Sequence, residues 1–308
     1  MGIELKKLTI GDCLGLESYS KLRPVFLSER QPINQFIWEE FYDTYYYRNE
    51  KYMMCVIESR GWNSPMMPFC RLEDIKDVFL EIKHHWNEVL KKPLSMYLVD
   101  ETFLETIKTI PGFEEEFTIE DSRDNYDYIY DADKLKTLSG KAYHKKKNHL
   151  NSFLKNYAGR YEYKSLNCKD VDEIQDFHNR WLDNREYEDK HGSIRSEENG
   201  IHRLFQYCGL FDFEIGGVYV DGQLEAYSIG SYAADTSCAY IHIEKANISI
   251  PGLYNFINQQ FLLNAFPDAK IVNREDDLGQ EGLRKAKLSY QPIKLEPKYH
   301  IFQRSHSK

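Results

Sequence analysis

Hydrophobic positions along the chain recur at two periods, one typical of helices and the other typical of strands. In segment 72–92, apolar side chains recur every three or four residues, which predicts an amphipathic helix. Within 213–232, alternating apolar residues flank Asp221-Gly222, a pair that favours a tight turn between two strands. The rest of the second half is predicted to contain helices at 170–185, 194–211, 251–266 and 276–290, and strands at 238–246, 269–275 and 296–302. The first half shows a looser version of the same order.

Length and charge set broad limits on the class of protein. A chain of 308 residues predicts about two domains, and we place the division between 1–158 and 159–308. The net charge of -9 argues against a surface that coats nucleic acid or acidic membranes as a whole, but it leaves room for a local basic patch. No run of about 18 apolar residues occurs, and the first residues lack the apolar core of a signal peptide. We therefore expect a cytoplasmic protein with no integral membrane segment.

The six cysteines are scattered, at positions 13, 55, 70, 168, 208 and 238. No CxxC motif and no Cys/His cluster occurs, so no metal site is expected. The pattern is typical of reduced, buried cysteines in a cytoplasmic protein.

Two segments carry a resemblance to a known family. "NREDDLGQEGLRKAKLSYQP" (273–292) resembles the signature of the DUF2156 family, which is similar to the C-terminal domain of phosphatidylglycerol lysyltransferases. "LSGKAYHKKKNHLNSFLKNY" (138–157) is similar to the middle motif of that family. The resemblance implies an α+β protein with two tandem GNAT-like domains, each a mixed central sheet flanked by helices, as in Fem-type aminoacyltransferases.

The family resemblance also implies an activity. Such proteins transfer an acyl or aminoacyl group from an activated carrier to an amine or hydroxyl, which makes aminoacyl-tRNA or acyl-CoA the expected co-substrate and requires no tightly bound cofactor. The acceptor would be a small molecule, a peptidoglycan precursor or a lipid. The chain lacks the long membrane-embedded region of the lysyltransferases that modify lipids, which argues against a lipid. The alternative is a non-catalytic ligand-binding protein that keeps the GNAT fold.

A basic segment stands out from the acidic whole. From Lys134 to Arg160 the chain has eight Lys or Arg and no Asp or Glu. A helix over 140–157 would present a basic face to a phosphate-rich donor such as tRNA or CoA, because each phosphate contact releases counterions. The residues expected on this surface are Lys141, Lys145, Lys146 and Lys147. Asn148 and Asn151 of the same helix are expected to line the cleft. The alternative is a solvated basic face, or one that pairs with acidic segments of the same chain.

The start of the helix predicted at 251–266 is a second candidate for donor binding. In a GNAT fold, backbone N–H groups at this position hold a pyrophosphate or the end of an aminoacyl-tRNA, since a helix N-terminus carries partial positive charge. Pro251, Gly252 and Leu253 would form this site, although the usual Gly-rich loop is absent. The alternative is an ordinary helix start, with Pro near the first position and Gly beside it.

The strand predicted at 238–246 carries polar side chains in alternation. If it is regular, Tyr240, His242 and Glu244 share one face and could line a cleft. A base there would remove the proton of the attacking acceptor. The candidate proton acceptors are Glu225, His242, Glu244 and Glu275. The alternative is a strand with one polar, solvated face.

The charges of segment 272–297 are sorted, with acidic residues first and basic residues later. Helix-end electrostatics explains this order, and Asp276 or Asp277 is expected to cap the helix. Gly279 and Gly282 lie three residues apart, so on a helix they would share a bare face that suggests close approach of a backbone or ligand. The remaining residues expected around the cleft are Tyr240, Asn273, Arg274, Asp276, Gly279, Gly282, Arg284, Lys287 and Tyr290.

Overall fold

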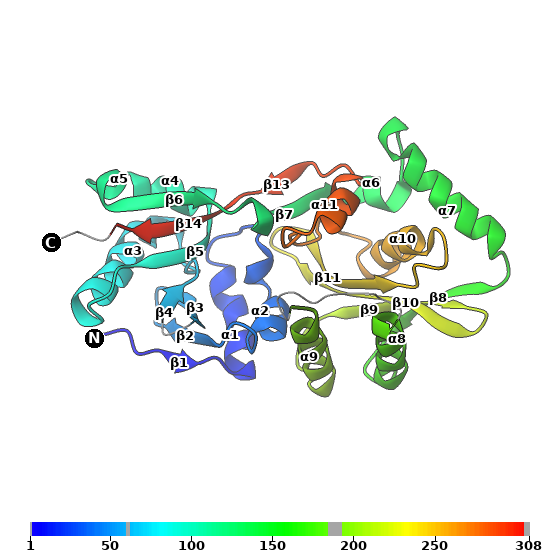
Figure 1. The fold of residues 1–308 in the computed structure, drawn as a ribbon, viewed down its shortest axis with the longest axis horizontal. Coiled ribbons are helices and arrows are strands. Elements are labelled where there is room, and N and C mark those ends of the chain that lie inside the picture. The colour runs from blue at the N-terminus through cyan, green and yellow to red at the C-terminus, as the bar shows by residue number, and fades with distance from the viewer. Residues whose placement is uncertain (1, 60–61, 184–192, 305–308) are drawn as a thin grey trace. The chain divides into compact units, whose positions relative to one another are not determined.

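The chain folds into two units, which Figure 1 traces from the N-terminus in blue to the C-terminus in red. The computed structural model describes residues 2–59, 62–183 and 193–304. The first unit comprises Met1–Asp127, Asp276–Gly279 and Glu296–Lys308. The second comprises Tyr128–Glu275 and Gln280–Leu295.

The first unit contains two antiparallel sheets. One has the order β1 (Lys6–Lys7), β2 (Thr44–Arg48), β3 (Met53–Ser59), β4 (Trp62–Pro65). The other has the order β5 (Ser95–Asp100), β14 (Lys298–Gln303), β6 (Phe117–Asp121). The helices of this unit are α1 (Ile10–Ser20), η1 (Ser28–Arg30), α2 (Pro32–Trp38), η2 (Leu72–Asp74), α3 (Ile75–His84), η3 (His85–Val89), α4 (Glu101–Lys108), α5 (Phe113–Glu116) and η4 (Arg123–Asn125).

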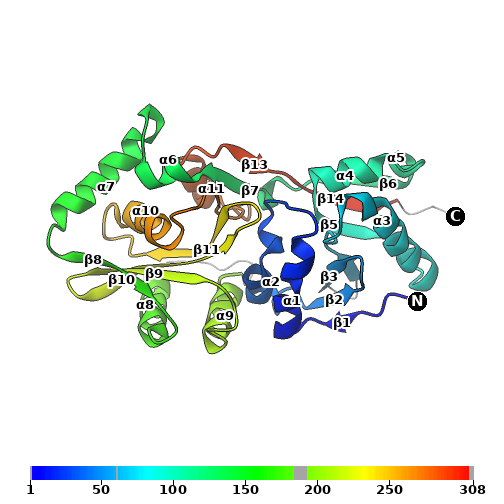
Figure 2. The same cartoon turned by 180° about the vertical axis from the view of Figure 1, so that it is seen from behind.

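The second unit is built on one mixed sheet of seven strands. Its order is β13 (Lys294–Glu296), β7 (Asp127–Asp131), β12 (Ile271–Asn273), β11 (Cys238–Ala246), β10 (Gln223–Ala233), β9 (Glu214–Val220), β8 (Tyr161–Leu166). The helices are α6 (Ala132–Thr137), η5 (Lys141–Tyr143), α7 (His144–Asn156), α8 (Val171–Asp183), α9 (Ser193–Gln206), α10 (Leu253–Ala265) and α11 (Glu281–Leu288). Helix α10 covers one face of the sheet, whereas α8 and α9 cover the other, as Figures 1 and 2 both show.

Most strongly patterned segments form the predicted elements. The amphipathic segment 72–92 forms α3 and continues into the π-helical turn η3. The Asp221-Gly222 pair joins β9 to β10, with both residues at positive φ as a tight hairpin turn requires. The helix predicted at 170–185 is α8, and the last two of those residues lie outside the described part of the chain.

The predicted division after residue 158 differs from the two units of the structure. Residues 128–158 belong to the second unit, because Phe153 of α7 packs on Phe256 of α10 with ring centroids 4.8 Å apart. The C-terminal segment returns to the first unit, since β14 pairs with both β5 and β6. Hydrophobic periodicity identifies such elements but does not reveal which sheet they join.

A fully buried lysine, Lys298, pairs with two buried carboxylates in the interior of the first unit. Lys298 Nζ donates to Glu29 Oε1 at 2.6 Å and to Asp127 Oδ1 at 2.8 Å. The backbone N–H of Ser28 donates to the other oxygen of Asp127 at 2.6 Å. Burial raises the pKa of Glu29 to about 7. The positive charge of Lys298 acts to lower this pKa, and the negative charge of Asp127 acts to raise it.

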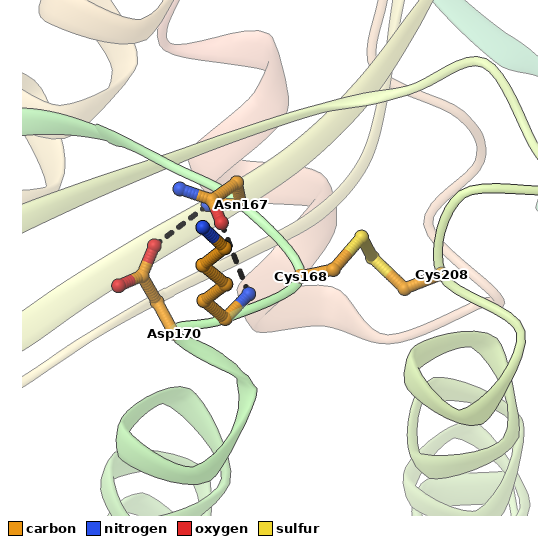
Figure 3. Close-up of a disulfide and its surroundings, with 5 residues drawn as sticks. Asn167, Cys168, Asp170 and Cys208 are labelled. Atoms are coloured by element: carbon orange, nitrogen blue, oxygen red, sulfur yellow. Dashed lines mark hydrogen bonds between the residues drawn. A yellow bond between two sulfur atoms is a disulfide. The ribbon is translucent and has the colours of Figure 1, made fainter.

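A disulfide joins Cys168, just before α8, to Cys208, just after α9 (Figure 3). The turn at Cys168 is held by Asn167, whose N–H donates to Asp170 Oδ2 at 2.8 Å. The expectation of six reduced cysteines is therefore wrong for this pair, while the other four are free and buried as expected. The reason is tertiary: α8 and α9 lie on the same face of the sheet, which brings together residues 40 positions apart.

Replacing Lys298 with Met should lower the free energy of unfolding by about 3–5 kcal/mol, because two buried carboxyl groups lose their counter-charge. Urea unfolding at neutral pH measures the loss. The control is Lys51→Met, at an exposed lysine, which should change stability by less than about 0.5 kcal/mol. A loss no larger than that of the control would contradict the assignment.

Thiol titration of the purified protein in denaturant without reductant should detect four thiols, because the other two are bonded. Replacing Cys168 with Ser should lower the free energy of unfolding by about 3–4 kcal/mol, because the unfolded chain loses a cross-link. The same substitution should have much less effect when both proteins are unfolded in reductant. Detection of six thiols without reductant would refute the pairing.

Candidate functional site

The candidate site lies where two neighbouring parallel strands separate. Strands β11 and β12 pair only over three residues, from Cys238–Ile271 to Tyr240–Asn273. Strand β12 then ends, while β11 continues to Ala246. The residues that follow Asn273 therefore face the free part of β11, and polar side chains from both segments meet there.

A β-bulge sets the direction of these side chains. Ile229 pairs with Ile243 and Gly230 pairs with Ile241, so His242 is the extra residue of β11. Ile241 packs in the core beneath α10, and Glu244 also faces α10. The prediction that Tyr240, His242 and Glu244 share one face is therefore wrong for Glu244.

His242 lies on the face covered by α8 and α9. Its Nδ1 is 2.7 Å from Glu275 Oε1, and its Nε2 is 2.8 Å from Ser231 Oγ. A carboxylate can only accept hydrogen bonds, so the neutral ring of His242 must carry its proton on Nδ1, where it donates to Glu275. Its Nε2 then accepts a hydrogen bond from the Ser231 hydroxyl. Glu275 has a positive φ of 56°, and its N–H donates to Asn273 Oδ1 at 2.6 Å, which holds the strained backbone. Asn273 thus positions Glu275, and Glu275 orients the ring of His242, as a carboxylate does for the histidine of a general-base site.

A second link closes the separation on the α10 face. Arg274 Nη2 donates to Glu244 Oε1 at 2.9 Å, and Asn258 of α10 donates to Glu244 Oε2 at 3.0 Å. Arg274 also lies against the rings of Tyr290 and Tyr130, at 4.9 and 5.9 Å from their centroids. Consecutive residues after β12 thus reach opposite faces of β11.

Residues of α11 and the segment after it complete this second cluster. Lys287 Nζ donates to the carbonyl oxygen of Arg274 at 2.6 Å, and Tyr130 Oη donates to the carbonyl oxygen of Lys287 at 2.9 Å. Tyr290 Oη accepts from Asn255 Nδ2 at 2.6 Å. Burial raises the pKa of Tyr290, so its hydroxyl stays protonated at neutral pH.

Helix α7 contributes one lysine to the cluster and turns the others to solvent. Lys146 Nζ lies 3.9 Å from the centroid of the Tyr290 ring. Lys141, Lys145 and Lys147 are exposed, and among the described residues none of the three forms an ion pair. Within the same basic segment, however, Arg160 pairs with Asp221. The alternative in which this segment pairs with acidic parts of the same chain therefore holds for Arg160 and not for these three lysines. Asn148 and Asn151, which were predicted for the cleft, are also exposed on α7.

Helix α7 packs closely against the start of α10, where the phosphate cradle is predicted. Gly252 has a φ of 84°, and a Cβ at this position would lie 2.3 Å from the carbonyl oxygen of His149. The glycine is therefore required by close packing of α10 on α7. Pro251 and Leu253 flank this contact, and Leu253 is buried. A donor role for these three residues stays a prediction that the packing does not favour.

The segment 276–280 is not helical and turns at Leu278-Gly279, which corrects the prediction of a helix over 276–290. Helix α11 starts at Glu281, and its N-cap residue Gln280 makes no side-chain capping bond, so neither aspartate caps it. Asp277 is buried and accepts from the N–H of Gly279 at 3.0 Å. Gly279, with φ of 71°, lies close to the Asp124 carboxylate, whereas a Cβ on Gly282 would meet nothing within 4 Å. The expected bare face shared by both glycines therefore does not exist.

The structure divides the other predicted site residues between different places. Asp276 and Gly279 belong to the first unit, and Arg284 lies half-buried on α11. Glu225 accepts from Asn247 Nδ2 at 2.8 Å and lies 3.5 Å from Arg180, so its carboxylate links a helix to a loop. Its role as a proton acceptor stays a prediction.

Three polar residues of the site were absent from the predictions. Ser231 gives no local signal, because only the strand pairing places it beside His242. Asn255 and Asn258 do have a signal in the sequence. They lie three residues apart on the face of α10 that is otherwise formed by apolar, buried residues. Such a pair of amides in an apolar stripe indicates buried hydrogen-bond partners.

Fold and site together define a class of protein: a mixed sheet with a strand separation lined by polar groups, in a chain with two GNAT-like units. The family model "Phosphatidylglycerol lysyltransferase, C-terminal" matches residues 27–302. The chain belongs to this family, which confirms the resemblance inferred from segments 138–157 and 273–292.

Solved structures agree with this assignment. A conserved protein of unknown function from Bacteroides thetaiotaomicron is 27% identical, with a TM-score of 0.84 over 98% of this chain and 100% of that chain. L-PGS from Bacillus licheniformis is 13% identical, with a TM-score of 0.65 over 95% of this chain and 92% of that chain. FemX is 8% identical, with a TM-score of 0.61 over 98% and 97% of the two chains. The predicted tandem GNAT-like fold with sheets flanked by helices is confirmed. The predicted mixed central sheet is present in the second unit, whereas the first unit has two antiparallel sheets instead.

The described ranges contain neither a membrane-spanning helix nor a metal cluster. Within them, no helix combines the length and apolar character needed to cross a bilayer. In the same ranges, no group of three His, Cys, Asp or Glu side chains has a geometry that suits a metal ion.

Proposed function

We propose that this chain transfers an aminoacyl group from an aminoacyl-tRNA to an amine or hydroxyl acceptor. The observation that carries the proposal is helix α7, whose exposed lysines have no carboxylate partner among the described residues. In a chain of net charge -9, such a surface suits a polyanion. The family name and the likeness to L-PGS support aminoacyl transfer as the reaction class.

The packing at Gly252 favours tRNA over acyl-CoA as the donor. An acyl-CoA donor would need the free N–H groups at the start of α10 for its pyrophosphate. Here the carbonyl of His149 lies against that helix start. The basic surface lies instead on the outer side of α7, where a large donor can approach it.

The reaction needs one proton acceptor and one proton donor. The acceptor's nitrogen or oxygen attacks the ester carbonyl of the donor, and a new acyl C–N or C–O bond forms. The ester bond to the tRNA ribose breaks, and the ribose oxygen leaves with a proton. We assign proton removal to His242, held by Glu275 at Nδ1 and connected at Nε2 to the Ser231 hydroxyl. The acceptor's proton passes to Ser231 Oγ as the hydroxyl proton of Ser231 passes to Nε2 of His242. The same histidine returns the proton to the leaving oxygen.

The acceptor is proposed only as a class, an amine or a hydroxyl. The family name refers to phosphatidylglycerol, a lipid whose reactive group is a hydroxyl. Lipids, peptidoglycan precursors and small molecules all offer a suitable nucleophile, and offering each fraction separately to the enzyme distinguishes them.

The double substitution Lys145→Glu/Lys147→Glu should weaken tRNA binding by at least tenfold at about 100 mM salt, because it reverses charge on the basic surface. It should also flatten the dependence of log affinity on log salt, by about one unit for each phosphate that the variant surface no longer neutralises. Fluorescence anisotropy with labelled total tRNA measures both quantities. The matched control is Lys51→Glu/Lys76→Glu, which makes the same charge change at exposed lysines of the first unit. Equal affinities for the two double variants would exclude α7 as the tRNA surface.

Replacing His242 with Asn should lower the single-turnover rate of aminoacyl transfer by about 10²-fold or more, because the proton acceptor is lost. The measurement uses tRNA charged with a mixture of radiolabelled amino acids and follows label into lipid, peptidoglycan-precursor and small-molecule fractions. Affinity for tRNA should stay within twofold. His202→Asn, at an exposed histidine of α9, should leave the rate unchanged. Binding of tRNA with no transfer by the unmodified protein would instead favour the non-catalytic alternative.

A further inference from the structure

Two cationic side chains converge on one aromatic ring on the α10 side of the candidate site. Lys146 Nζ lies 3.9 Å from the centroid of the Tyr290 ring, and the Arg274 guanidinium lies 4.9 Å from it. Lys146 is half-buried on α7, and the Arg274 side chain is only 12% exposed. Besides burial, the charge of Arg274 lowers the pKa of Lys146, so the two cations repel each other.

The surrounding groups leave this pair with an excess of positive charge. Around Lys146, β11 contributes Glu244, the segment after β12 contributes Arg274, α7 contributes Lys145, and the segment after α11 contributes Tyr290. Among these groups, Glu244 supplies the negative charge. Its two carboxylate oxygens already accept hydrogen bonds from Arg274 and from Asn258 of α10. The single negative charge of Glu244 therefore lies near two positive charges, those of the half-buried Lys146 and the largely buried Arg274.

The Arg274 guanidinium has hydrogen-bonding capacity left over. Nη2 donates to Glu244, whereas Nη1 is buried without a hydrogen-bond partner in the described part of the chain. A buried charged donor without a partner is costly, and such groups recur where a ligand completes the bonding. The long side chain of Lys146, which lies against the same Tyr290 ring, can change its rotamer without disturbing the backbone of α7.

The protonation of Lys146 fits the same arrangement. Burial, followed by the charges of Arg274 and Lys145, lowers the pKa of Lys146 to about 8. Its ammonium form is therefore destabilised near neutral pH in the free protein, and a bound anion would favour it again.

We propose that Lys146 and Arg274, which both lie against the Tyr290 ring, form a binding site for a tetrahedral phosphate-class oxyanion. Guanidinium and ammonium groups donate charge-assisted hydrogen bonds to phosphate oxygens, and Arg offers a planar pair of donors. The identification of this phosphate as a phosphodiester near the 3′ end of the donor tRNA rests on the proposed function. A phosphate group of the acceptor has the same chemistry.

The site is tested with sulfate, whose charge stays constant between pH 7 and 9. Isothermal titration of the full chain should show about tenfold weaker sulfate binding at pH 9 than at pH 7, because Lys146 with a pKa of about 8 loses its proton in this range. The Lys146→Met variant should bind sulfate weakly and equally at both pH values. Lys155→Met, on the same helix and exposed, should keep the tenfold change. Urea unfolding confirms that each variant is folded.

Arg274 is tested separately, because its loss could disturb the link to Glu244. The Arg274→Lys variant keeps the charge but loses the planar pair of donors, and it should weaken sulfate binding about tenfold or more at pH 7. No sulfate binding by the unmodified protein, or equal pH dependence in the Lys146→Met variant, would overturn the proposal.

Competition distinguishes the two sources of the phosphate. The dinucleotide CpA carries the phosphodiester of the donor end, and glycerol 1-phosphate represents a phosphate-bearing acceptor. Displacement of sulfate by CpA and not by glycerol 1-phosphate is the expected result. The reverse result would overturn the donor assignment. Sulfate binding that depends on Lys146, in a protein that transfers no aminoacyl group, would retain the site and reject the proposed function.

Discussion

The short parallel pairing of β11 with β12 is the constraint on which the candidate site depends. Three paired residues fix the two strands, and the chain after Asn273 is then free to cross the end of β12. The bulge at His242 shifts the later part of β11 by one residue. As a result, Arg274 and Glu275, which are neighbours, form links to β11 on opposite faces of the sheet. Removing the bulge would return Glu244 to the face of His242 and break one of the two links.

The packing of α7 on α10 determines how a donor can approach. Gly252 is needed because the backbone of α7 comes too close for any side chain. Phe153 and Phe256 fill the interface between the two helices. With its apolar side used in this way, α7 presents its lysines to solvent and directs only Lys146 toward the site. The same helix therefore packs against one predicted phosphate site and contributes Lys146 to another.

Several residues that suggested one role from the sequence have a different role in the structure. The glycines of segment 276–290 indicated a bare helical face, but Gly279 terminates a turn at positive φ and Gly282 meets open space. Asp277 looked like a helix cap, yet it is buried and holds that turn. The cysteines lacked any paired motif, and two of them nevertheless form a bond across α8 and α9. Each error arises where a contact between distant residues overrides a local preference.

The sequence by itself determined the class of fold, the order of its main helices and strands, the hairpin at Asp221-Gly222, the basic character of α7 and the family. These follow from periodicity, turn chemistry, composition and two motifs, which are all local properties. Only the tertiary structure decided that Ser231 lies beside His242, that Glu244 pairs with Arg274, and that β14 returns to the first unit. Strand register, bulges and sheet membership are set by the packing of distant segments, and periodicity along one segment contains no information about its partner.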